Sequence, residues 1–183
     1  MQRGKADFGL LLVGMLWGLG FVFVKIGLNE GITPFYLLTI RFLVAFIILF
    51  VIFRSRLKNI EKSDLKNGFI IATFLFLGFA FQISGAALTT ASNNAFFTAI
   101  NVIIVPYIFW AIHKHVPNIF SFIAAGLCIL GVGILSFDSK MQLNQLNEGD
   151  ILTIISALFF AFHIAFTGFL STKSEPIKLN VIQ

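Results

Sequence analysis

The 183-residue chain has only eight acidic residues, and none of them lies inside its long apolar stretches. It also has a single cysteine, Cys128, so it contains no disulfide of its own and no cysteine cluster for a metal ion. Catalytic signatures are missing as well, because a nucleophile, a buried base and an orienting acid cannot be assembled from segments without carboxylates. The sequence therefore supports neither an enzyme, nor a metal site, nor a bound cofactor.

Apolar residues dominate what is present. They make up 58% of the chain and charged residues only 11%, whereas about a quarter of a typical soluble domain is charged. The apolar runs are about 20 residues long and do not alternate as barrel strands do, so we expect helices that cross a bilayer. The expected fold is an all-α, polytopic membrane helix bundle. Its six spans are predicted at residues 8–27, 35–53, 68–89, 94–112, 118–137 and 151–170.

Helix start signals and loop charges agree with these spans. The loop before the second span ends in Pro34, which suits a first helical position, and Asp150 stands where the last span needs its N-cap. Ten cations lie in the terminus and loops on one side, against one on the other. The positive-inside rule therefore places the amino terminus in the cytosol. The net charge of +5 is explained by this topology, so nucleic acid is not an expected partner.

Two cations interrupt the apolar stretches, Lys25 and Arg41. An unpaired cation at mid-bilayer costs roughly 2.5 to 3.5 kcal/mol, so each invites a functional hypothesis. Lys25 lies near the outer end of its span, where its stem could also snorkel to the headgroups. Arg41 lies about two turns into the second span and snorkels less easily. It either lines a solute cavity or binds backbone carbonyls at a helix end.

Polar residues form stripes that could line a solute path. Asn94, Thr98 and Asn101 recur at intervals of four and three, so they share one helix face. The alternative is that they join helices by hydrogen bonds, as Asn and Thr often do in membranes. Gln82 is a weaker candidate. His163, near the middle of the last span, is either a proton site or a neutral, hydrogen-bonded histidine.

Three further residues bear on helix packing. Pro106 removes a backbone donor and so predicts a kink or a packing site in the fourth span. Gly18, with Gly14, forms a small-xxx-small pair of the kind that lets helices approach closely. Trp17 between them is either an interfacial anchor or a wall of a solute path.

The chain resembles the EamA-type transporters of the drug/metabolite transporter superfamily along its whole length. The segments that carry the resemblance are Leu16-Trp17-Gly18 with Lys25, Pro34 and Arg41-Phe42-Leu43, then Ala87 to Phe96, Asn101, Val105-Pro106, Gly131 to Leu135 and Gly149 to Leu152. One departure is His113-Lys114-His115, which occupies the loop where many members have an acidic residue. Any role of that acid is in doubt here.

The resemblance implies ten spans in two five-helix repeats of opposite orientation. Residues 1–138 would form the first repeat, with its amino terminus in the cytosol. Residues 150–183 would be the start of a truncated second repeat. The superfamily also includes four-helix exporters with an essential glutamate in the first span, which this chain lacks. Without a buried carboxylate, cationic drugs are poor candidates, and neutral, zwitterionic or anionic metabolites are easier to host.

The resemblance thus predicts a multi-pass secondary transporter of the inner (plasma) membrane. It would move small polar metabolites or amino-acid-like solutes by alternating access. Its partners would be the small-molecule substrate and the lipid bilayer, and a homodimer is left open. The alternatives are a membrane scaffold or assembly subunit that transports nothing, or an inactive transporter fragment.

Overall fold

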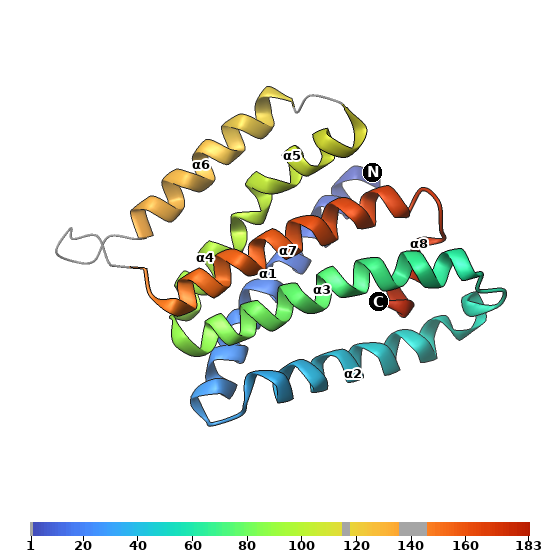
Figure 1. The fold of residues 1–183 in the computed structure, drawn as a ribbon, viewed down its shortest axis with the longest axis horizontal. Helices are drawn as coiled ribbons and strands as arrows, with labels where there is room; N and C mark the ends of the chain where they lie inside the picture. The colour runs from blue at the N-terminus through green and yellow to red at the C-terminus, as the bar shows by residue number, and fades with distance from the viewer. Residues whose placement is uncertain (1, 115–117, 136–145) are drawn as a thin grey trace.

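A computed structural model describes residues 2–114, 118–135 and 146–183, and every regular element in these ranges is a helix (Figure 1). The expected all-α polytopic bundle is confirmed. The bounds are α1 Gln2–Asn29, α2 Pro34–Phe53, the short 3₁₀ helix η1 Arg54–Leu57, α3 Lys62–Leu88, α4 Ala91–Ala99, α5 Asn101–His113, α6 Ile119–Leu135, α7 Glu148–Leu170 and α8 Pro176–Ile182.

Five stretches of the described residues are long and apolar enough to cross a membrane. They are Asp7–Asn29, Pro34–Leu57, Lys62–Leu88, Ala91–Ile112 and Glu148–Leu170. The remaining predicted span, 118–137, corresponds to α6, which has 17 residues and ends beside residues outside the described ranges. The predicted junction between the two repeats, at 138–150, also lies largely outside them.

Capping residues explain where the central helices begin. Pro34 opens α2 as predicted. The N-cap of α7 is Asn147, whose side chain accepts from the Asp150 backbone N–H at 2.9 Å. The prediction that Asp150 is itself the N-cap is therefore wrong by three residues. Asp150 is the third helical residue, and its carboxylate accepts from the Asn147 N–H in return, which completes a capping box.

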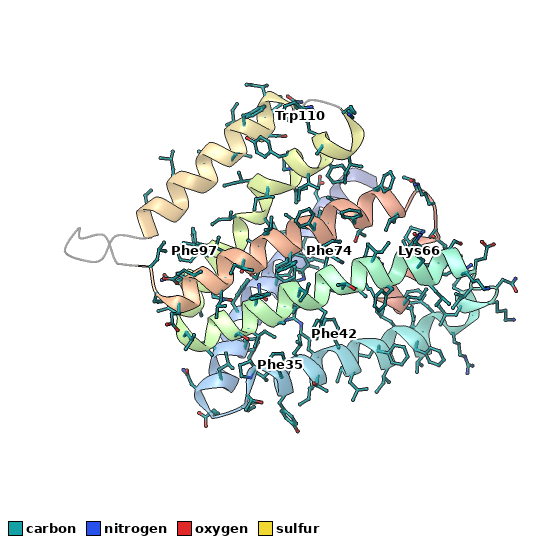
Figure 2. The ribbon with its side chains drawn as sticks, viewed as in Figure 1. Phe35, Phe42, Lys66, Phe74, Phe97 and Trp110 are labelled. Atoms are coloured by element: carbon teal, nitrogen blue, oxygen red, sulfur yellow. The ribbon has the colours of Figure 1, made fainter. Side chains whose placement is uncertain are left out.

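The antiparallel pair α3 and α7 forms the centre of the bundle (Figure 1). Glycines let the two backbones approach, because a Cβ on Gly85 would lie only 2.7 Å from the Gly149 carbonyl oxygen. Nearer the middle of the pair, Phe74 of α3 (labelled in Figure 2) stacks on both Phe162 and Phe166 of α7, with ring centroids 5.4 and 5.3 Å away. Small residues at the outer end and aromatic rings further along hold this pair together.

The predicted fourth span is two helices, α4 and α5, rather than one. The interruption falls at Ile100, whose N–H donates to the Phe97 carbonyl oxygen at 3.3 Å in a tighter turn. Pro106 lies inside α5, six residues further on. The break at Ile100 was not predicted and lies about a turn and a half before Pro106, where the predicted kink or packing site stays a prediction.

Helix α1 lies against the bundle on one side and leaves the rest of its surface open. Trp17 is 67% exposed, and a Cβ on Gly18 or Gly14 would meet no atom within 4 Å in the described part of the chain. The predicted packing role of this glycine pair thus has no partner among the described residues, and it stays a prediction.

Candidate functional site

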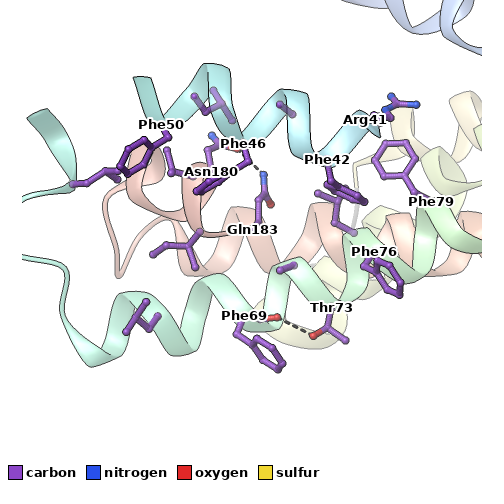
Figure 3. A pocket seen from close by; sticks show the side chains of 18 of the residues that line it. Arg41, Phe42, Phe46, Phe50, Phe69, Thr73, Phe76, Phe79, Asn180 and Gln183 are labelled. Atoms are coloured by element: carbon purple, nitrogen blue, oxygen red, sulfur yellow. Dashed lines mark hydrogen bonds between the residues drawn. The ribbon is translucent and has the colours of Figure 1, made fainter. Parts of the chain in front are cut away.

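A cavity of ≈ 880 Å³ lies between α2 and α3, with α8 forming part of its wall (Figure 3). Its lining is mostly apolar and includes six phenylalanines, Phe42, Phe46, Phe50, Phe69, Phe76 and Phe79. The polar side chains that line it are Arg41, Thr73, Asn180 and Gln183. It is a long, apolar space with a cation at one end.

Arg41, an exposed residue, lies at the end of this cavity nearer the start of α2, about 10 Å along the helix from Pro34. Its guanidinium carbon lies 4.2 Å from the ring centroid of Phe79, a cation–π contact. Phe79 is fixed in turn by edge-to-face contacts with Phe42 and Phe160, with centroids 5.8 and 5.0 Å apart. Among the described residues no salt bridge joins Arg41 to a carboxylate. An aromatic face thus positions the guanidinium, and its N–H donors can still bind a solute.

Gln183 connects the cavity to His163. Its side-chain oxygen lies 2.9 Å from His163 Nε2, and its amide donates to Asn180 Oδ1 at 2.7 Å. Gln183 and Asn180 line the cavity, whereas His163 lies behind them on α7. The structure thus places the only histidine predicted at membrane depth one hydrogen bond away from the candidate site.

The other predicted pathway residues gather elsewhere, where α3, α4 and α7 meet. Asn94, 1% exposed, donates to the Gln82 carbonyl oxygen at 3.0 Å and to Thr153 Oγ1 at 2.8 Å. Gln82 in turn donates to Thr98 Oγ1 at 3.1 Å. None of these residues lines the cavity. In this arrangement their polar groups join helices, as the alternative reading of the stripe proposed. Asn101, half-buried at the start of α5, does not line the cavity either.

Lys25 lies neither at the cavity nor in the polar cluster between α3, α4 and α7. Its ammonium donates to the Ala86 carbonyl oxygen at 2.8 Å. Ala86 is in the last turn of α3, where carbonyls lack intrahelical partners and the helix dipole favours a cation. Lys25 therefore holds α1 against the carboxyl-terminal end of α3, and its side chain is directed to that helix end.

The sequence analysis did not predict that two carboxylates are buried: it named Asp150 only as an N-cap and did not single out Asp64, because both lie outside the apolar runs. Asp150, 3% exposed, accepts from Thr89 Oγ1 at 2.6 Å and from Asn93 Nδ2 at 3.4 Å. Asp64, 5% exposed, lies 3.5 Å from Lys178 Nζ on α8. Each is the third residue of a helix that begins with a capping box, and that local pattern was the available signal.

The fold and the cavity define a multi-pass helical membrane protein with a cation-bearing, apolar cavity between two of its spans. Within the described residues, no three His, Cys, Asp or Glu side chains gather as metal ligands. The arrangement can bind and orient a solute by hydrogen bonds and ring contacts.

The chain belongs to the EamA-like transporter family, whose model matches residues 4–137. It is 36% identical to a protein of Archaeoglobus fulgidus over 179 residues, which is 98% of this chain and 54% of that protein. A second protein of the same organism is 29% identical over 171 residues, 88% of this chain and 57% of the relative. Both are described only as uncharacterized transporters. The chain thus spans a little over half the length of these relatives. No solved structure matches it.

Proposed function

We propose that the protein is a secondary transporter that moves small polar metabolites or amino-acid-like solutes across the cytoplasmic membrane by alternating access. The cavity between α2 and α3 is the region that takes the solute. The observation that carries this proposal is the placement of Arg41, a guanidinium at one end of a mostly apolar cavity, without a carboxylate partner among the described residues. Such a group is costly at membrane depth, and a bound solute that accepts its hydrogen bonds offsets that cost.

Two properties of the cavity support a solute site. Its volume of ≈ 880 Å³ falls within the range of about 300–1,000 Å³ that small-molecule pockets occupy. Its α2 wall is loosely held, because Leu38 is the only residue described as fully buried on that helix. An element with few buried contacts is the one expected to shift when the cavity opens or closes.

Replacing Arg41 tests the solute site directly. In proteoliposomes loaded with a panel of labelled carboxylates, amino acids and sugars, Arg41→Ala should lower the flux of the transported solute on the order of tenfold, because a charge-assisted hydrogen bond is lost. Arg41→Lys should retain part of the flux, because it keeps the charge without the planar fork of donors. Arg54→Ala, an exposed arginine at the cytoplasmic end of α2, is the matched control. Equal flux in Arg41→Ala and Arg54→Ala would remove Arg41 from the site.

Thiol labelling separates a transporter from a scaffold that uses the same bundle without a path. In a Cys128→Ser background, Thr73→Cys should react with a membrane-impermeant thiol reagent, because Thr73 is exposed and lines the cavity. Asn94→Cys and Thr98→Cys should stay unlabelled, because both positions are buried between helices. A scaffold predicts no reaction at any of the three. Reaction at Asn94→Cys would instead show that water reaches this position, as expected of a residue that lines the solute path.

A further inference from the structure

The cavity lining carries positive charge and no negative charge. Arg41 is the only charged residue among those that line it, and the other polar side chains are a threonine and two amides. A solute that carries a negative group therefore finds a partner. A solute that carries an ammonium finds amide and hydroxyl oxygens but no carboxylate, and burying such a cation without a counter-charge is unfavourable.

The cavity is also long and aromatic. Its α2 wall runs from Arg41 to Phe50, about 14 Å at the rise of an α-helix. Phe42 and Phe46 lie on that wall, and Phe69 and Phe76 of α3 lie at the open side of the cavity, 73% and 47% exposed (Figure 3). An apolar body placed along these rings gains buried area and ring contacts, while its charged end reaches Arg41.

We propose that the cavity binds organic anions with an apolar, preferably aromatic body, such as an aryl-alkyl carboxylate, with the anionic group on Arg41 and the body along the phenylalanines. This inference rests on the proposed transport function and replaces its broad substrate class by organic anions, which excludes the amino-acid-like zwitterions. It selects net anions over zwitterions and cations, because the lining supplies a partner for the carboxylate and none for an ammonium.

A series of phenyl compounds of similar size tests the charge preference in the 183-residue chain, held in phosphatidylcholine nanodiscs. 3-Phenylpropionate should bind, measured by equilibrium dialysis of the labelled compound. L-Phenylalanine should compete on the order of tenfold more weakly, and 2-phenylethylamine should not compete at all. Propionate, which keeps the carboxylate but has no ring, should compete poorly. Equal competition by phenylalanine or phenylethylamine would overturn the proposal.

Substitutions then test which cavity residue contacts the carboxylate of the ligand and which contacts its ring. Arg41→Gln should weaken binding of 3-phenylpropionate about tenfold and remove the preference over phenylalanine. Phe76→Ala should weaken binding and leave that charge preference intact. Arg54→Gln, outside the cavity, is the control. The helical signal and the elution volume of each variant show whether it is folded, and Arg41→Lys provides a second, conservative change. Unaltered binding in Arg41→Gln contradicts the proposal.

The anion could come from water or from the bilayer, because Phe46, Phe69 and Phe76 are exposed and the cavity opens between α2 and α3. We infer a soluble carboxylate. Repeating the measurement with phosphatidylglycerol in the nanodisc should leave binding unchanged. If phosphatidylglycerol weakens 3-phenylpropionate binding to the unmodified chain but not to Arg41→Gln, a lipid phosphate occupies Arg41. The proposal that the ligand is a soluble carboxylate would then be overturned.

The binding assay does not depend on transport, so the proposed transport function and the proposed anion class can be rejected independently. If flux depends on Arg41 but binding favours zwitterions, the anion class fails and the transport site stands. If 3-phenylpropionate binds through Arg41 but neither it nor any other compound is transported, the binding site stands and the proposed function fails.

Discussion

Replacing Gly85 with leucine is expected to separate α3 from α7 and to destabilise the bundle by about 3 kcal/mol, at the upper end of ordinary overpacking. A Cβ at this position would lie 2.5 Å from Thr153 Oγ1 and 2.7 Å from the Gly149 carbonyl oxygen. Because one obstacle is backbone, it cannot rotate away, and the helices must move apart. The shift should appear as unfolding at a lower denaturant concentration in detergent micelles.

The same substitution at Gly126 of α6 is the matched control, because a Cβ there would meet no atom within 4 Å among the described residues. Gly126→Leu should leave stability unchanged or raise it by about 0.5–1 kcal/mol, because leucine has the higher helix propensity. If both variants unfold at the same denaturant concentration, the close approach of α3 and α7 is not what stabilises the bundle.

Replacing Lys178 with methionine is the second change with a large expected effect, about 3 kcal/mol, because it leaves the buried Asp64 carboxylate without its cation. The side chains of Lys178 and Asp64 are only 15% and 8% exposed. Lys178 Nζ also donates to the Asn59 carbonyl oxygen at 3.0 Å, so the substitution removes one contact of α8 with the loop before α3 and one with the first turn of α3. Hydrogen exchange at the α8 amides should accelerate most.

A second substitution distinguishes the buried charge from simple loss of packing. Adding Asp64→Asn to Lys178→Met should recover much of the lost stability, because the uncompensated charge disappears. Glu175→Gln breaks the exposed pair with Arg56 and should cost less than about 1 kcal/mol. No recovery in the double variant would mean that the Lys178 stem, and not its charge, holds α8.

Hydropathy predicted the spans well because each residue's preference for lipid is local and adds along a helix. It could not predict the break at Ile100. Nothing in that residue disfavours a helix, and the nearby proline drew the prediction to Pro106. Helix α8 was also missed as an element, although the start of a further span was expected there. Its seven residues are too few to stand out in a hydropathy window.

The candidate site was predictable only in part. Arg41 could be selected because a cation in an apolar run is rare, but its partner Phe79 lies on another helix and carries no distinguishing pattern. The spacing of Asn94 and Thr98 predicted a shared face correctly. Which neighbour that face meets depends on Thr153, 59 residues away, and periodicity within one helix holds no information on such a contact.

The antiparallel arrangement of α3 and α7 also determines how the bundle responds to a transmembrane voltage. Each helix has its positive end beside the negative end of the other, so a field across the bilayer does little net work if the pair shifts as a unit. Voltage dependence measured in this protein would then report the movement of full charges, such as that of Arg41 on α2, and not of the α3 and α7 dipoles.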